Sequence, residues 1–224
     1  MNLYIDIETL PTERPEIAQI LSKDIHAPGN YKKQESIDKW MEENYEKEVE
    51  DRVRKTSLSG DFGQILCIGF AIDEEPVSVL YREDEFITEE SMLDYFFRIL
   101  QGILGDREHK NITWIGHNIG GFDLRYLQKR CVVNGVKPKP AIPYNKSLFS
   151  GEFFDTMYEW SGLKDRISQD NLCLALGLPT KPGMTGADVF DYWRAGKHQE
   201  IKDYCRHDVE SVRRIHKKLT FKEI

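Results

Sequence analysis

The sequence has no long apolar run and no N-terminal signal peptide. Its four cysteines include no CxxC pair, which disfavours a zinc site and a disulfide framework. It also lacks an excess of positive charge, since the formal net charge is −7 at pH 7. A protein that coats nucleic acid by charge alone would be basic, so that class is disfavoured. These absences predict a soluble, cytoplasmic protein with no membrane partner.

The composition nevertheless provides enough apolar material for a folded core. Hydrophobic residues make up 40% and aromatic residues 11% of the 224 residues, which excludes a disordered chain. This length suits one α/β domain or two small ones. The negative charge does not exclude an enzyme whose site carboxylates are neutralised by metal ions.

Hydrophobic periodicity predicts strands and helices that alternate along most of the chain. The predicted strands are 2–8, 64–72, 77–81, 111–116 and 152–157. The predicted helices are 89–104, 122–133, 169–176, 187–194 and 198–218. The first three strands are expected to form an antiparallel meander, and the later strands, which follow helices, to pair in parallel. The pattern predicts an α/β fold with a mixed five-stranded sheet flanked by helices.

Residues 11–60 interrupt this order and are predicted to be a helical insertion in a single domain of residues 1–224. Within them, 33–53 is a charged segment whose apolar residues recur three or four positions apart, as in an amphipathic helix. Two interpretations stay open. The helix is either a solvated element on the side of the domain or a flap whose flanking cations bind phosphates. Those cations are Lys32, Lys33, Arg52, Arg54 and Lys55.

Two acids share one face of the first predicted strand. Because side chains alternate along a strand, Asp6 and Glu8 point one way while Leu3, Ile5 and Ile7 point the other. Two carboxylates on an apolar strand repel each other, and a hard cation such as Mg²⁺ or Mn²⁺ stabilises such a pair. The alternative is an edge strand whose polar face lies in water.

Two further segments carry candidate acids. Asp123 ends the sequence NIGGFD at 118–123 and begins a predicted helix, where exposed backbone N–H groups favour an acid even without a ligand. On the closing helix, Tyr204 and Asp208 are four residues apart and therefore share a face at the edge of the buried stripe. The alternative for Asp208 is a pairing with Arg206 or Arg213.

Together the three segments resemble the Exo I, Exo II and Exo III motifs of the DEDD superfamily of 3′–5′ exonucleases. Asp6 and Glu8 match the DxE of the first motif, and 118–123 matches the Asn, aromatic and Asp of the second. Each motif is short, but all three occur in order on the expected strand, loop-helix junction and helix. The order of elements over 1–220, apart from the insertion, resembles the ribonuclease-H-like fold.

The third motif resembles the tyrosine (DEDDy) version of the superfamily. Tyr204 is followed by three residues and Asp208, whereas the histidine version requires a histidine at position 203, which is Asp. The chain is most similar to exonuclease domains of family-B DNA polymerases and to stand-alone proteins predicted to be exonucleases like them. The resemblance implies a hydrolase that shortens single-stranded DNA from its 3′ end and releases nucleoside 5′-monophosphates.

The resemblance also implies a set of site residues. Two divalent ions, Mg²⁺ or Mn²⁺, would hold the attacking water and stabilise the leaving 3′-oxygen. The implied catalytic metal ligands are Asp6, Glu8, Asp123 and Asp208. Tyr204 is implied to orient the attacking water. The implied substrate contacts are Thr9, Leu10, Asn118 and Phe122, with core packing as the open alternative for Leu10 and Phe122.

Two other functions stay open at this point. One is a 3′–5′ exoribonuclease of the same superfamily. The other is a catalytically silent module that binds nucleic acid or a polymerase, which the acids in all three motifs disfavour. Because the sequence shows no polymerase domain, proofreading would require a polymerase or another replication or repair protein as a partner in trans.

Overall fold

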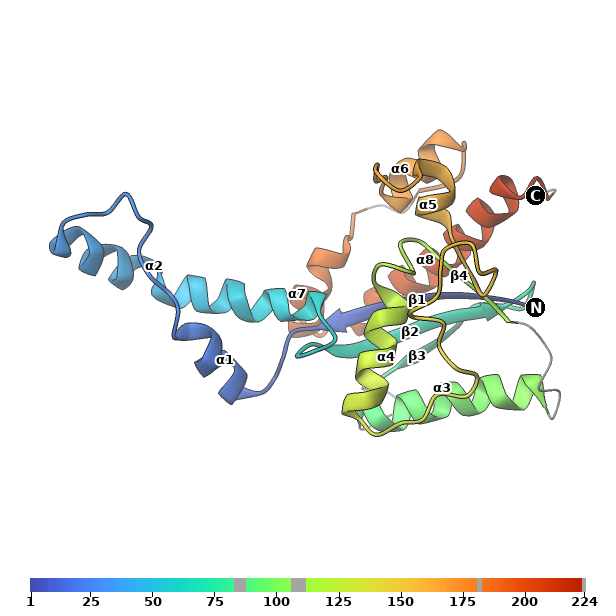
Figure 1. Ribbon diagram of the computed structural model, residues 1–224, viewed down its shortest axis with the longest axis horizontal. Coiled ribbons are helices and arrows are strands. Elements are labelled where there is room, and N and C mark those ends of the chain that lie inside the picture. The colour runs from blue at the N-terminus through green and yellow to red at the C-terminus, as the bar shows by residue number, and fades with distance from the viewer. Residues whose placement is uncertain (83–87, 106–111, 181–182, 223–224) are drawn as a thin grey trace. The chain divides into compact units, whose positions relative to one another are not determined.

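A computed structural model of the chain describes residues 1–82, 88–105, 112–180 and 183–222. The chain divides into two compact units, one of Met1–Glu8 with Ile65–Ile224 and one of Thr9–Gln64 (Figure 1). The second unit contains the predicted insertion. The grouping of both units into one domain stays a prediction. Among the helices of the described ranges, none is long and apolar enough to cross a membrane.

The first unit is built on a five-stranded sheet with the strand order β3-β2-β1-β4-β5. The strands are β1 (Asn2–Leu10), β2 (Gln64–Ile72), β3 (Ser78–Tyr81), β4 (Thr113–Gly116) and β5 (Phe153–Asp155). β3 runs antiparallel to β2, whereas β4 runs parallel to both β1 and β5. The predicted mixed five-stranded sheet is therefore confirmed, and β1 is an inner strand.

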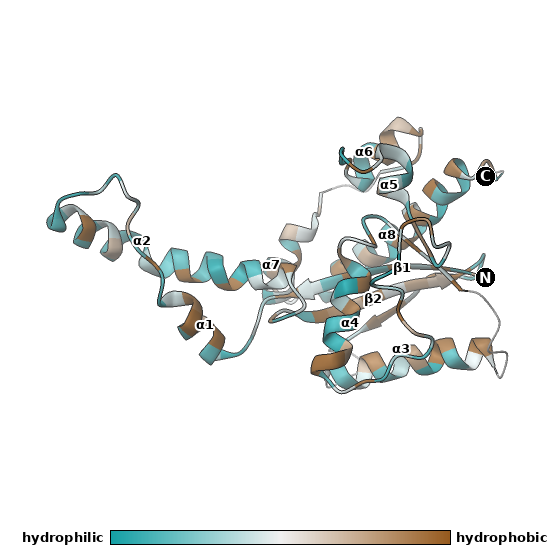
Figure 2. Ribbon diagram, in the orientation of Figure 1, coloured by the Kyte–Doolittle hydropathy of each residue, from teal (hydrophilic) through white to brown (hydrophobic). Residues whose placement is uncertain are grey.

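Helices cover both faces of this sheet. On one face, α3 (Glu89–Leu104) and α4 (Asp123–Val133) enclose a core that includes Leu3, Ile5 and Ile7 of β1. On the other face lies α8 (His198–Leu219), whose Val209 packs with Tyr4. Apolar and polar residues alternate along α3 and α8, as expected for helices with one buried side (Figure 2).

Helix α8 approaches the sheet closely at Gly69 of β2. A Cβ atom built on Gly69 would lie 2.7 Å from the Sγ atom of Cys205 and 2.9 Å from Cγ2 of Val209. Both distances are too short for any side chain, so glycine is required for this packing. The first half of α8, which carries Tyr204, is thereby held against the central strands.

Some predicted bounds differ from the structure. The strand predicted over 152–157 ends at Asp155, and Thr156 begins α5 (Thr156–Ser161), because the Asp155 carboxylate caps that helix. α6 (Gln169–Ala175) matches its prediction within one residue. The helix predicted over 187–194 is a 3₁₀ turn, Gly186–Asp188, followed by α7 (Val189–Arg194). Asn111, predicted to begin the fourth strand, lies outside the described residues.

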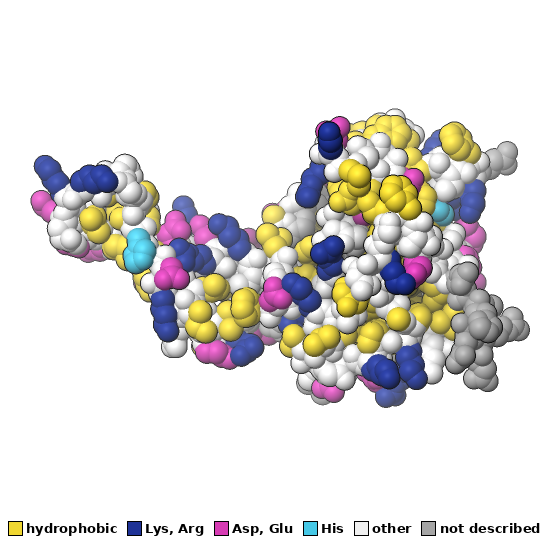
Figure 3. All heavy atoms as spheres, in the orientation of Figure 1, with side chains coloured by type: hydrophobic (Ala, Val, Ile, Leu, Met, Phe, Trp, Pro, Cys, Tyr) yellow, Lys and Arg dark blue, Asp and Glu magenta, His cyan; other side chains and the backbone are white. Residues whose placement is uncertain are grey.

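The second unit contains α1 (Pro15–Ser22) and α2 (Gln34–Lys55). Arg52 of α2 donates hydrogen bonds of 2.9 Å to the carbonyls of Leu21 and Asp24 near the end of α1. This cation therefore joins the two helices. None of the 22 residues of α2, all of them described, is buried. Acidic and basic side chains are interspersed on the face of α1 and α2 seen in Figure 3.

Candidate active site

The first two candidate acids form a close pair near the end of β1. Carboxylate oxygens of Asp6 and Glu8 and the Sγ atom of Cys205 all lie within 4.8 Å of one another. Glu8 is buried and Asp6 half-buried, and β1 has a neighbouring strand on each side, so the edge-strand alternative is wrong. A hydrogen bond with Cys67, together with burial, raises the pKa of Cys205 well above its ordinary value. The sulfur is therefore a neutral thiol, and the carboxylates are the donors that suit a hard cation.

Asp123, the first residue of α4, is buried beside the same strand. Burial and, to a smaller extent, the negative charges of Asp155 and Asp208 raise the pKa of Asp123 to about 7. Hydrogen bonds with the backbone of Asp123 itself and of Ile7 act in the opposite direction. Since Ile7 separates Asp6 from Glu8, the third acid lies next to the first pair.

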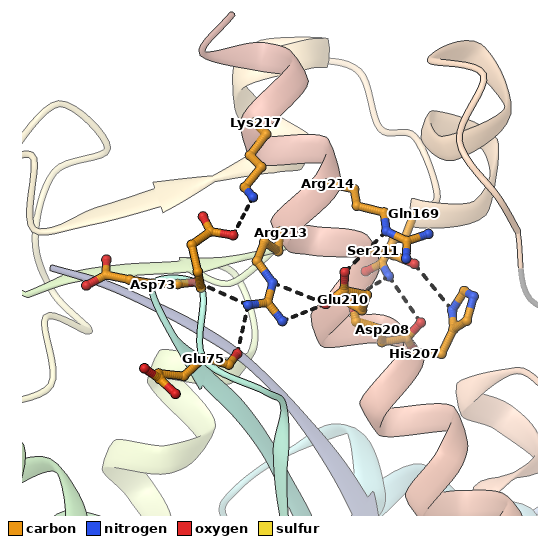
Figure 4. A network of polar contacts seen from close by, with 11 residues as sticks. Asp73, Glu75, Gln169, His207, Asp208, Glu210, Ser211, Arg213, Arg214 and Lys217 are labelled. Atoms are coloured by element: carbon orange, nitrogen blue, oxygen red, sulfur yellow. Dashed lines mark hydrogen bonds and ion pairs between the residues drawn. The ribbon is translucent and has the colours of Figure 1, made fainter. Parts of the chain in front are cut away.

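Asp208 is buried on α8 and is held by α6. The Nε2 atom of Gln169 donates hydrogen bonds of 3.1 Å to the Asp208 carboxylate and to its backbone carbonyl (Figure 4). The arginines considered as partners of Asp208 pair elsewhere: Arg206 with Asp203, and Arg213 with Glu210. The alternative that Asp208 pairs with Arg206 or Arg213 is therefore wrong.

Tyr204 lies among these acids. Burial raises the pKa of Tyr204 above its ordinary value, and the charges of Asp208, Glu8 and Asp6 raise it further. The phenol is therefore protonated at neutral pH and acts as a hydrogen-bond donor, not as a base. Its ring also lines a pocket of about 330 Å³ together with Met184, Tyr192 and His207.

The predicted site residues thus gather around the last residues of β1, with one distinction. Asp6 and Glu8 form the close pair, whereas Asp123 and Asp208 lie near enough to affect neighbouring pKa values but do not join the group within 4.8 Å.

The four predicted substrate contacts have local roles in the structure. The Thr9 hydroxyl donates a 2.8 Å hydrogen bond to the Ser57 carbonyl. Leu10 is fully buried, and Phe122 is half-buried against the core. Asn118 adopts a left-handed backbone conformation in its loop, with a φ angle of 59°. Their contacts with nucleic acid stay predictions.

Sequence reasoning did not identify two polar residues that hold the site. Gln169 contacts Asp208, and Asp155 accepts hydrogen bonds from the loop that leads to Asp123. An aspartate directly before a helix is a recognisable N-cap signal, but nothing local points to the contact of Gln169.

Comparison with known proteins assigns the fold and the family. Residues 61–212 match the family described as a predicted 3′–5′ exonuclease related to the exonuclease domain of PolB. The chain belongs to this family. The matched residues include Asp123, Tyr204 and Asp208, whereas Asp6 and Glu8 precede them.

The family B DNA polymerase from the hyperthermophilic archaeon Pyrobaculum calidifontis has a similar structure. The TM-score is 0.59 at 15% sequence identity, over 98% of this chain and 24% of the polymerase chain. The likeness confirms the ribonuclease-H-like fold, and this chain spans about a quarter of that polymerase. No curated protein matches the sequence.

Proposed function

We propose that this member of the predicted exonuclease family is a DEDDy enzyme that hydrolyses single-stranded DNA from its 3′ end and releases nucleoside 5′-monophosphates. The observation that carries the proposal is the gathering of acids at one end of β1. Asp6 and Glu8 lie within 4.8 Å of each other, and Asp123 and Asp208 approach from α4 and α8.

The donor set fits divalent metal ions. Asp6, Glu8, Asp123 and Asp208 offer carboxylate oxygens, which Mg²⁺ and Mn²⁺ prefer, and their charges would offset those of two such ions. When bound, the ions would activate the attacking water and stabilise charge on the phosphate and on the leaving 3′-oxygen. Burial of Glu8, Asp123 and Asp208 limits their hydration, which strengthens their attraction for a cation.

Tyr204 would orient the attacking water. Its protonated hydroxyl lies near Asp208, Glu8 and Asp6, where it can donate a hydrogen bond to a substrate oxygen or share one with the water. It cannot act as a general base at neutral pH, because its pKa is raised above its ordinary value. The proposed role is therefore positioning, as in the tyrosine version of the superfamily.

The proposed partners are the 3′ end of a single strand and, for proofreading, a polymerase or another replication or repair protein in trans. The likeness to a polymerase that contains such a domain supports the second of these.

The proposal is tested with DNA and RNA oligonucleotides of one sequence, each labelled at the 5′ end. With Mg²⁺ or Mn²⁺ we expect a ladder of shortened DNA and release of mononucleotides, and no cleavage with chelator. Asp6→Asn and Asp208→Asn should abolish cleavage, and Asp94→Asn, a surface acid on α3, is the matched control. Cleavage of RNA alone would support the exoribonuclease, and full activity of either site variant would contradict the proposal.

A further inference from the structure

Asp155, the last residue of β5, binds the backbone on two sides. It is 2% exposed, and its Oδ1 atom accepts hydrogen bonds from the backbone N–H groups of Asn118, Met157 and Tyr158, at 2.9, 3.1 and 3.4 Å. Its Oδ2 atom accepts one from the Gly120 N–H at 3.1 Å. The carboxylate therefore joins the start of α5 to the loop that follows β4.

This loop fits against β5 without spare room. A Cβ atom on Gly120 would lie 2.9 Å from the Phe153 ring and 3.6 Å from Oδ2 of Asp155. A Cβ atom on Gly121 would clash with Oδ1 of Asn118. Glycine at both positions thus allows the backbone to reach the Asp155 carboxylate.

The residue after Asp155 contacts the same loop. The Oγ1 atom of Thr156 lies 3.0 Å from Nδ1 of His117 and 3.3 Å from the Gly116 carbonyl. The Nε2 atom of His117 donates to the Ile167 carbonyl at 2.9 Å, since a carbonyl oxygen can only accept. The start of the loop is therefore held at His117 by Thr156 of α5 and by Ile167, which lies ahead of α6.

The loop leads directly to Asp123. The N–H group of Phe122 donates to the Asn118 carbonyl at 2.9 Å, and the next residue is Asp123. A shift of the Asn118–Gly120 backbone would therefore move the Asp123 carboxylate relative to Asp6 and Glu8.

We infer that Asp155 is a positioning residue of the exonuclease site, which fixes the 118–121 loop and through it the metal-binding carboxylate of Asp123. The inference rests on the proposed function. A carboxylate suits this role better than an amide, because both of its oxygens accept hydrogen bonds. In Asp155→Asn, an NH₂ group would face an N–H donor that it cannot accept from.

The test compares Asp155→Asn with Thr88→Ala. Thr88 caps α3 by accepting a 3.1 Å hydrogen bond from the Ser91 N–H, so its variant loses a helix cap but no contact with the loop or with Asp208. Two quantities are measured, the affinity for Mn²⁺ by titration followed by electron paramagnetic resonance, and kcat and KM on labelled single-stranded DNA. Urea unfolding shows that each variant is folded.

We expect Asp155→Asn to bind Mn²⁺ about 10- to 100-fold more weakly, the loss typical of removing an outer partner of a metal ligand. Its kcat should fall similarly, KM for DNA should stay near the wild-type value, and raised Mn²⁺ should restore part of the activity. Gly120→Ala, which displaces the loop but keeps the carboxylate, should show the same pattern. It replaces Asp155→Asn as the test if that variant fails to fold.

Wild-type Mn²⁺ affinity and kcat in folded Asp155→Asn or Gly120→Ala would overturn this inference and leave the proposed function intact. An equal loss in Thr88→Ala would also overturn it. A wild-type protein that neither binds Mn²⁺ nor cleaves DNA would overturn both.

Discussion

The close approach of α8 to β2 predicts that Gly69→Ala damages the site from a distance. The added Cβ would lie 2.7 Å from Cys205 Sγ and 3.3 Å from the Cys205 backbone carbonyl. Rotation of the thiol relieves the first contact but not the second, so the helix backbone itself must move. Because α8 carries Tyr204 and Asp208 while β2 lies next to β1, the movement separates these residues from Asp6 and Glu8.

The size of the effect follows from the distances. Carbon atoms in contact are normally about 3.5–4.0 Å apart, whereas the added Cβ would lie 2.9 Å from Cγ2 of Val209, so α8 must shift by several tenths of an ångström up to about 1 Å. Overpacking of this kind destabilises a protein by about 1–3 kcal/mol. A reacting group misplaced by about 1 Å loses up to about 100-fold in rate. We therefore expect Gly69→Ala to remain folded and to lose roughly 10- to 100-fold in kcat.

Urea unfolding and the oligonucleotide assay measure the two effects separately. Gly102→Ala in α3 is the matched control, because no heavy atom lies within 4 Å of its new Cβ and alanine favours a helix. Adding Cys205→Ala to Gly69→Ala removes one clash and should recover part of the stability. Wild-type kcat in a Gly69→Ala protein that is destabilised as expected would refute the argument that this contact positions the acids.

Three further predictions concern single residues. Tyr204→Phe should lower kcat by up to about 100-fold while Mn²⁺ affinity stays unchanged, and wild-type turnover would make Tyr204 purely structural. Burial lowers the pKa of His216 to about 4, so its stabilising effect is complete above the unfolded-state pKa of about 6.5 and is lost as the pH falls towards 4. Between these pH values the wild-type free energy of unfolding, measured with urea, should fall by roughly 3 kcal/mol more than that of His216→Gln. Parallel pH profiles of the two proteins would contradict this prediction. Glu89→Ala leaves the buried Arg130 without its 2.6 Å ion pair and should lower the free energy of unfolding by about 3–5 kcal/mol. Surface ion pairs contribute only about 0–1 kcal/mol, so a loss below about 1 kcal/mol would contradict burial of the pair.

The parts of the fold that the sequence predicts well are those with strong local signals. β2 and α3 have the predicted bounds. Thr88 caps α3 by accepting the Ser91 N–H, and Gly105, with a φ angle of 58°, ends it. Pro15 occupies the first helical position of α1, where a missing N–H group has no effect, so this proline does not break the helix.

The site shows the same division between local and long-range information. The shared face of Asp6 and Glu8 follows from strand alternation alone. Asp155 contacts the 118–121 loop, and Gln169 contacts Asp208, across sequence separations of 35 to 39 residues. No periodicity in the sequence predicts these contacts. Only the packing of β5, α5 and α6 brings those side chains to the site.

The central claim is that carboxylates at the end of β1 bind a pair of divalent ions. The most direct measurement is an anomalous difference map of a crystal grown with Mn²⁺ and a nucleoside 5′-monophosphate. We predict two Mn²⁺ peaks beside the carboxylates of Asp6, Glu8, Asp123 and Asp208. Full occupancy by the nucleotide with no Mn²⁺ peak beside Asp6 and Glu8 would contradict it.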